Sequence, residues 1–260
     1  MNQRENSIQI INHNFLHHST FLQSQTAGMR AHHRDGVSWS DSGLNCDTFN
    51  ILYITDHNTL SDASLQEVID HYRQNDLAFC AWINEENLSP AIKSALERSG
   101  LQEAGSEPGM ILELEAFQHT PAAADISKLN TRSGLQQFAH IVSLNWNPPD
   151  KDVARFYERV AETVLHPSSH IAYYASFIDN KPVSVVEVFP DNAYNAGIYS
   201  VCTLKEFRGR GIATDLMKFC LQQLKNAGYR TATLQAADDG LNIYKKLGFT
   251  ASTRFYEFKP

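Results

Sequence analysis

The sequence of 260 residues is poor in cysteine, and its cysteines do not form a recognisable metal or disulfide pattern. The four cysteines, at positions 46, 80, 202 and 220, have neither metal-ligand spacing nor the density of a disulfide framework. We therefore expect reduced thiols that serve in core packing. The histidine pairs at 17–18 and 32–33 are adjacent in sequence, and neighbouring side chains cannot both face one site from a regular helix or strand. These features predict no metal ion.

The chain also lacks an excess of positive charge and any long apolar run. It carries 22 Lys and Arg against 29 Asp and Glu, a net charge of −7. This balance argues against a general nucleic-acid binder, which needs a basic face for phosphates. No run is long enough to span a membrane, and residues 1–11 have no apolar signal-peptide core. These observations predict a cytoplasmic protein with no nucleic-acid or membrane partner.

A loop rich in glycine and arginine follows an apolar, β-prone run near residue 200. The loop contains Arg208, Gly209, Arg210 and Gly211, and a segment with apolar residues at helical spacing begins at Ile212. Glycines let the main chain approach an anion closely, and free N–H groups at a helix start bind phosphate. The loop has neither the Lys-Ser/Thr pair of a Walker A loop nor the G-x-G-x-x-G of a dinucleotide-binding turn.

The C-terminal half alternates between strand and helix patterns. A helix is expected after Asp150, and the polar turn Asp179-Asn180-Lys181 predicts a hairpin between strands 171–178 and 182–189. Residues 197–204 form the next strand, and the helix 211–227 is expected to stop at Gly228. A strand, a short helix and a closing strand at 255–258 complete an α/β order with a mixed sheet.

The Arg-Gly loop resembles the pyrophosphate-binding motif of the GCN5-related N-acetyltransferase (GNAT) family. Arg208, Gly211 and Ala213 occupy the places of its Arg/Gln, Gly and Gly/Ala residues. The later run Tyr244-Lys245-Lys246-Leu247-Gly248-Phe249 resembles the family's Tyr-x-x-x-Gly-Phe signature. The resemblance covers about residues 130–260 and implies the acyl-CoA N-acyltransferase fold there. It implies acetyl-CoA as co-substrate, bound by the following set: Val201, Cys202, Thr203, Arg208, Gly209, Arg210, Gly211, Ile212, Ala213 and Thr214.

The N-terminal half repeats part of this order. Strand, helix, strand, short helix and strand patterns follow one another from residue 49 to 117, and Ser89-Pro90 predicts the start of the second helix. Ser64 and Glu67 have the spacing of a capping box at the start of the first of these two helices. We expect an irregular segment at 1–44, a smaller, degenerate GNAT-like domain at 45–118, a linker at 119–135 and a catalytic domain at 136–260. Coincidence is the alternative, because βαβ units are common.

The resemblance implies that Tyr244 is a general acid. A phenol with a pKa near ~10 is protonated at neutral pH and can donate to a thiolate whose parent thiol has a pKa near ~8.5. An aromatic residue packed on the sheet is the alternative. Many family members have an Asn where this chain has Ala237. Asp238 and Asp239, which follow it, are expected to cap the helix that carries Tyr244.

The general base is less defined. Glu187 lies in the apolar run 183–189, where a carboxylate is costly unless it is paired or faces a cleft. It is therefore either the base or a salt-bridged surface group. Cys202 allows an acyl-cysteine mechanism, although a cysteine in an apolar strand is usually a core residue and the family generally transfers directly.

Three functions fit the sequence. The first is transfer of acetyl from acetyl-CoA to a primary amine of a small molecule, protein or peptide. The second is a non-catalytic acyl-CoA sensor or scaffold. The third is an acyltransferase for a longer chain or a hydroxyl acceptor. Residues that select the acceptor vary freely on this fold, so the sequence predicts neither the acceptor nor the oligomeric state.

Overall fold

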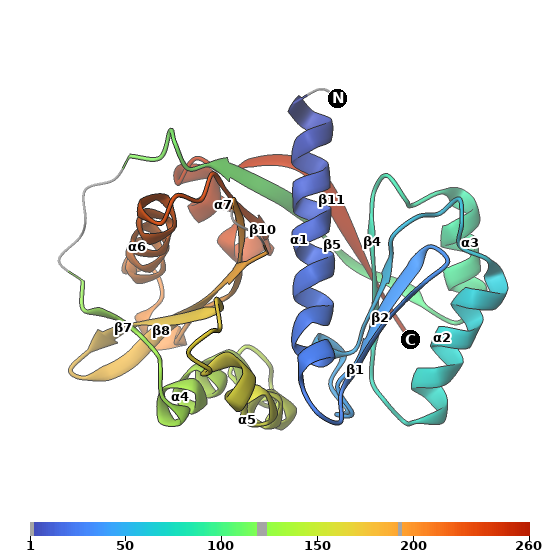
Figure 1. Cartoon of the computed structure of the whole chain (residues 1–260), viewed down its shortest axis with the longest axis horizontal. Coiled ribbons are helices and arrows are strands. Elements are labelled where there is room, and N and C mark those ends of the chain that lie inside the picture. Colours follow the sequence, from blue (N-terminus) through green and yellow to red (C-terminus); the bar gives the residue numbers. More distant parts are fainter. Residues whose placement is uncertain (1–2, 119–123, 192–193) are drawn as a thin grey trace. The chain divides into compact units, whose positions relative to one another are not determined.

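The computed structural model of the chain describes residues 3–118, 124–191 and 194–260. It divides into two compact units (Figure 1). Unit 1 consists of residues 1–109 together with 251–260, and unit 2 of residues 110–250. No helix in the described ranges is both long and apolar enough to cross a membrane.

Unit 1 is a mixed sheet with helices packed against it. Its strands follow the order β1-β2-β3-β4-β11-β5, and β3 and β4 are parallel. Its elements are α1 (Gln3–Gln25), β1 (Arg30–Arg34), β2 (Val37–Asp41), the 3-10 helix Asp47–Phe49, β3 (Ile51–Ile54), α2 (Asp62–Gln74), β4 (Cys80–Asn84), α3 (Pro90–Arg98), β5 (Gln102–Glu113, through residue 109) and β11 (Thr250–Lys259, from residue 251).

The expectation of an irregular segment over residues 1–44 is wrong, because α1, β1 and β2 occupy most of it. In α1 the ring of Phe15 packs against Tyr53, Trp82 and Phe255 at centroid distances of 5.0, 5.8 and 4.9 Å. Polar side chains share the buried side of this helix, and Gln23 donates from Nε2 to the Phe49 carbonyl at 3.1 Å. This mixture conceals the apolar period on which a helix prediction depends.

Unit 2 also contains mixed β-sheet structure, with a pair of helices on each face (Figure 1). Its strands follow the order β5-β10-β9-β8-β7-β6; β9 and β10 are parallel, whereas β9, β8, β7 and β6 pair antiparallel. Its elements are β5 (residues 110–113), β6 (Ile126–Lys128), α4 (Arg132–Ser143), α5 (Lys151–Val164), β7 (Ala172–Ile178), β8 (Lys181–Pro190), β9 (Asn195–Thr203), the 3-10 helix Lys205–Phe207, α6 (Ile212–Asn226), β10 (Thr231–Gln235) and α7 (Asp238–Lys246).

Several local predictions are confirmed. β7 and β8 form a hairpin in which Ile178 pairs with Lys181, and Asp179 and Asn180 have φ of 50° and 59° in the turn. This is the left-handed pair that a two-residue turn requires. Asp150 caps α5, Ser89 caps α3, and Pro90 occupies its first turn. The predicted capping box is wrong, because Ser61 caps α2 and accepts from the Ser64 N–H.

The compact units differ from the expected domain boundaries, because each unit contains the closing strand of the other half. β11, expected to close the C-terminal half, pairs antiparallel with β4, and Phe258 lies in the core of unit 1. Met110, Leu112 and Leu114, expected to close the N-terminal half, lie in the core of unit 2. The expected linker 119–135 includes β6 and the start of α4, and its residues 119–123 lie outside the described ranges.

Candidate active site

The loop before α6 has the geometry of an anion-binding turn. Gly209 and Gly211 have φ of 73° and 80°, a region that costs other L-residues roughly 1–2 kcal/mol. A Cβ built on either glycine would meet nothing within 4 Å, so the space beside the main chain is open. Gly211 is the N-cap of α6 and offers no side-chain acceptor to the first turn of the helix. The N–H groups of that turn therefore face the position where a phosphate binds at a helix start.

The two loop arginines are exposed and held in different ways. Arg208 donates from Nε to the carbonyl of Thr203 at 3.0 Å, which ties the loop to the end of β9. The guanidinium of Arg210 lies over the ring of Phe207, with the central carbon 5.2 Å from the ring centroid. Both cations thus stand beside the glycine turn, where they complement a polyanion.

β9 carries a bulge directly before this loop. Val185 pairs with Cys202, but Glu187 pairs with Tyr199, so Val186 alone faces the two residues Ser200 and Val201. Ser200 has a φ of 51°, the left-handed conformation found in such irregularities. A bulge leaves backbone groups unpaired in the ladder, and here it involves Ser200 and Val201, at the start of the segment 201–203 that the family resemblance implies for acyl-CoA.

The pairing between β9 and β10 stops before this bulge. Residues 195–197 pair with residues 231–233, whereas β9 extends to Thr203 and β10 to Gln235. Beyond Gly197 and Thr233 the two strands therefore no longer pair with each other. An extended ligand with amide groups fits such an edge because it can bond in the place of a strand.

Glu187 projects from β8 toward the α4/α5 face of the unit 2 sheet. Its neighbours Val186 and Val188 project to the other face and join the core beneath α6 and α7. Glu187 is only 1% exposed, so the alternative of a surface group is wrong. The hydroxyl of Tyr157 on α5 donates to its Oε2 at 3.3 Å.

Aromatic side chains enclose this carboxylate. Phe138 on α4 makes edge contacts with Tyr157 and Tyr173, at centroid distances of 5.0 and 4.8 Å. Burial first, and then the nearby charge of Glu187, raises the pKa of Tyr157 and of Tyr173 well above the ordinary value. Both phenols therefore stay protonated near neutral pH. The Tyr157 hydroxyl donates to the carboxylate, whereas the Tyr173 hydroxyl has no hydrogen-bond partner among the described residues.

Cys202 is a buried thiol on the same face of the sheet. Asn145, in the loop between α4 and α5, donates from Nδ2 to its Sγ at 2.7 Å. Burial raises the pKa of the Cys202 thiol to about 11, although the Asn145 bond and the charge of Arg208 lower it in part. A thiol with this pKa is almost wholly protonated near neutral pH, which opposes the acyl-cysteine alternative.

Tyr244 lies on α7, on the opposite face of the sheet from Glu187. It is 8% exposed, belongs to the core cluster, and meets Phe249 edge-on at a centroid distance of 6.0 Å. Its ring lies over Gly240, since a Cβ built there would be 2.6 Å from a ring carbon. The proposed acid and base thus approach the β9/β10 edge from different faces.

The start of α7 lacks a side-chain cap. Ala237 is the N-cap residue, and Asp238 and Asp239 lie in the first turn, so the prediction that they cap the helix is wrong. An Asn at this N-cap would supply both a cap and the side-chain amide that many family members have there.

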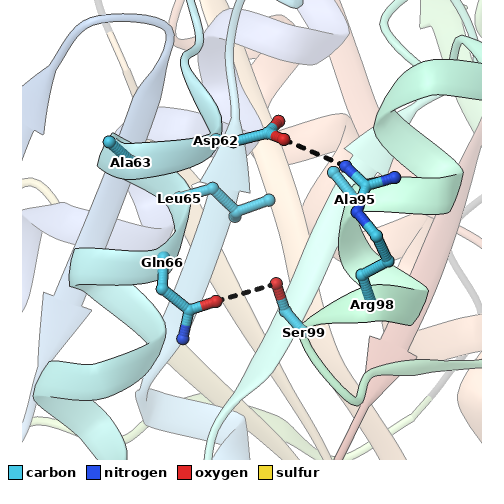
Figure 2. A pocket seen from close by; sticks show the side chains of 7 residues that line it. All are labelled: Asp62, Ala63, Leu65, Gln66, Ala95, Arg98 and Ser99. Atoms are coloured by element: carbon cyan, nitrogen blue, oxygen red, sulfur yellow. Dashed lines mark hydrogen bonds and ion pairs between the residues drawn. The ribbon is translucent and has the colours of Figure 1, made fainter.

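A separate hollow of about 350 Å³ lies in unit 1, between the start of α2 and the end of α3 (Figure 2). Its polar groups bond to one another: Arg98 contacts the Asp62 carboxylate at 2.9 Å, and the Ser99 hydroxyl donates to Gln66 at 3.1 Å. None of the predicted site residues lines it. In the described ranges, no group of three His, Cys, Asp or Glu side chains is arranged to hold a metal ion.

Sequence reasoning missed Tyr157, Asn145 and Tyr173. Tyr157 is separated from Glu187 by 30 residues and Asn145 from Cys202 by 57, so no short motif links either pair. Only the sheet register and the packing of α4 and α5 bring them together.

Parts of the chain are similar in sequence to known acetyltransferases. Residues 147–259 match the family model described as an acetyltransferase (GNAT) domain. The uncharacterized N-acetyltransferase ycf52 of Pyropia yezoensis is 37% identical over 71 residues, which are 27% of this chain and 41% of that protein. N-alpha-acetyltransferase 30 of Schizosaccharomyces pombe is 34% identical over 64 residues, which are 24% of this chain and 43% of that protein. The chain thus spans about two fifths of the length of these curated relatives.

Solved structures extend the likeness in fold to nearly the whole chain. A GCN5-related N-acetyltransferase from Kribbella flavida superposes with a TM-score of 0.68 at 15% identity, covering 94% of both chains. A tandem GNAT protein from the clavulanic acid biosynthesis pathway gives a TM-score of 0.57 at 14% identity, covering 86% of this chain and 78% of that one. The chain has the fold of the GNAT acetyltransferases, and its residues 147–259 match the acetyltransferase domain of that family.

Proposed function

We propose that the protein is an acetyl-CoA-dependent N-acetyltransferase that acetylates a primary amine. The observation that carries this proposal is the succession of the β9 bulge at Ser200, the glycine turn at Gly209 and Gly211, and the uncapped start of α6. Backbone groups at the bulge suit an amide-bearing arm and a thioester carbonyl, and the turn suits a pyrophosphate. These residues fit acetyl-CoA, which supplies the activated acetyl group when it is bound.

The remaining residues have distinct roles in this proposal. Segment 201–203 and residues 208–214 hold the co-substrate. Glu187 removes a proton from the acceptor amine, directly or through water, and Tyr157 keeps that carboxylate in place. Tyr244 donates a proton to the departing sulfur. Proton transfers of this kind typically contribute 10²–10⁴-fold each to a rate.

Unit 1 has a supporting role in the proposal. Its order of β3, α2, β4, α3 and β5 parallels the order of β9, α6, β10, α7 and β11. In place of the Arg-Gly loop it has Thr55 and Asp56, and Leu96 stands at the position of Tyr244. We therefore propose that unit 1 is a degenerate acetyltransferase-like half, and that the acceptor is a small-molecule or peptide amine of a cytoplasmic reaction.

Calorimetric titration with acetyl-CoA tests the co-substrate site. The wild type should bind, and the double variant Arg208→Ala/Arg210→Ala should bind at least ~10-fold more weakly, because each charge-assisted contact contributes about 1.5–3 kcal/mol. Arg132→Ala/Arg155→Ala is the matched control, since both arginines are exposed and pair with carboxylates of unit 2. Absence of binding at millimolar acetyl-CoA would reject the acetyl-CoA enzyme and leave a longer acyl-CoA or a structural role.

Turnover separates an enzyme from a sensor or scaffold. If acetyl-CoA binds and a panel of amines releases CoA at rates that fall with Glu187→Gln, the enzyme is supported. Tight binding without release of CoA from any amine or alcohol would favour the acyl-CoA sensor.

A further inference from the structure

Four side chains form a row across the α4/α5 face of the unit 2 sheet. Tyr173 on β7 pairs with Glu187 on β8, and Glu187 pairs with Tyr199 on β9. Thr233 on β10 pairs with Gly197, so Gln235, two residues later, is level with Tyr199 and on the same face. The row therefore runs Tyr173, Glu187, Tyr199, Gln235.

The other face of these strands confirms this orientation. The core beneath α6 and α7 includes Val186 and Val188 of β8 together with Ala232 and Leu234 of β10. Because side chains alternate along a strand, Glu187 and Gln235 must both project away from that core. They share the face on which the proposed base meets the acceptor.

Gln235 has an unsatisfied donor. Its Nε2 atom is buried and has no hydrogen-bond partner among the residues that the structure describes. A buried amide without a partner is costly, and native proteins rarely keep one without a use. Gln235 also ends β10, two residues beyond the pair Thr233–Gly197 that is the last between β10 and β9, where a ligand can reach it.

We infer that Gln235 is a specificity-determining residue, and that its Nε2 donates a hydrogen bond to a carbonyl oxygen of the acceptor. This inference rests on the proposed function. Glu187 and Gln235 lie two strands apart, so their Cα atoms are separated by roughly 10 Å. The distance between the carboxylate and the amide is shorter where the two side chains extend toward each other. Tyr199 lies between them on β9, so an acceptor with its amine toward Glu187 and a carbonyl toward Gln235 would lie against the Tyr199 side chain. The acceptor class is an amine whose neighbouring carbon bears a carboxamide or peptide carbonyl.

A matched pair of amines tests this class. L-Leucinamide and 3-methylbutylamine differ only in the carboxamide, and CoA release reports acetylation of either. The wild type should prefer L-leucinamide by at least ~10-fold in kcat/KM, since a site with a buried donor discriminates against a molecule that leaves the donor unpaired. Gln235→Leu should lower the ratio of the two kcat/KM values at least ~10-fold by slowing the reaction of L-leucinamide, while kcat/KM for 3-methylbutylamine and the KM for acetyl-CoA change less than about twofold. The comparison of variant with wild type cancels the difference in basicity between the two amines.

Gln222→Leu is the control, because Gln222 lies on α6 and its Nε2 bonds to the Asn226 side chain at the surface. It should retain the wild-type preference. The inference is overturned if Gln235→Leu affects both amines equally, if the wild type does not distinguish them, or if acetyl-CoA binds and neither amine reacts. A raised KM for acetyl-CoA would assign Gln235 to the co-substrate instead. Failure to bind acetyl-CoA by calorimetry would reject the proposed function itself.

Discussion

The hydroxyl of Tyr157 donates a hydrogen bond to Oε2 of Glu187 at 3.3 Å, and both groups are almost fully enclosed. The tyrosine comes from α5 and the glutamate from the middle of the β8 strand, so the contact joins a helix to the sheet it covers. An enclosed carboxylate needs such donors, because an unpaired buried charge is expensive.

Removing this donor should affect both stability and catalysis. Tyr157→Phe keeps the ring and its packing but takes one partner from the carboxylate. We expect the free energy of unfolding to fall by about 1–3 kcal/mol, measured by urea denaturation, and kcat to fall by more than ~10-fold with acetyl-CoA affinity unchanged. Tyr194→Phe is the control, since Tyr194 is 52% exposed. Equal kcat for wild type and Tyr157→Phe would remove Tyr157 from the proposed mechanism.

Gly240 leaves room for the Tyr244 ring. In the first turns of α7, Gly240→Ala gains helix propensity of about 1 kcal/mol but places a Cβ 2.6 Å from a ring carbon. The ring must rotate away, so we expect kcat to fall while acetyl-CoA still binds. Gly105→Ala, where a Cβ meets nothing within 4 Å, should have wild-type kcat. If Gly240→Ala has wild-type kcat and a crystal structure shows the ring displaced, Tyr244 is not the acid.

The raised pKa of Cys202 predicts a loss of stability in alkali. The folded pKa of about 11 lies above the reference value of 9.0 for an unfolded chain. The native state therefore holds this proton longer than the unfolded state. The contribution of this proton to the free energy of unfolding is fully present below pH 9. It is lost as the pH rises from 9 to 11, and the total loss is roughly 2–3 kcal/mol.

Urea denaturation at pH 8 and pH 10.5 gives the loss of unfolding free energy between the two pH values. The effect of Cys202 is the difference between this loss in the wild type and in Cys202→Ala, because the other buried thiols and phenols titrate in both proteins. Cys202→Ala should lose less stability between the two pH values and should retain acetylation. Trapping of an acetyl group on Cys202 by mass spectrometry would contradict the direct transfer proposed above.

Phe258 should matter to unit 1 although it is close to the end of the chain. It is fully buried in the core formed by α2, α3, β3 and β4. Phe258→Ala should cost about 3–5 kcal/mol and release hydrogen-exchange protection in α2 and α3. Phe249→Ala, in the core of unit 2, is the comparison, and protection should then be lost in α6 and α7. The same pattern of exchange for both variants would mean that the units unfold together.

The parts of this fold that could be predicted are those set by local chemistry. The Asp179-Asn180 turn, the Ser89-Pro90 helix start and the stop at Gly228 each depend on residues adjacent in the chain. Helix α1 could not be predicted in this way, because Asn14 and Gln23 are buried among its apolar side chains.

In the candidate site, too, local features could be predicted from the sequence and long-range contacts could not. Its loop is contiguous, so Arg208 and Gly211 identify it from sequence. The Tyr157–Glu187 bond and the alignment of Gln235 with Tyr199 depend on register across strands from different parts of the chain. The exchange of closing strands was equally hidden, because the pairing of β11 with β4 joins residues that are far apart in the chain.

The place of β11 has a consequence for how the protein is made. Unit 1 is assembled mostly from residues 1–109, yet its core includes Phe258 and its sheet includes residues 251–260. As the chain leaves the ribosome, about 140 further residues must be synthesised before this strand can pair with β4. The first unit to emerge is therefore completed late, and until then β4 presents an open edge that must be kept from pairing with other chains.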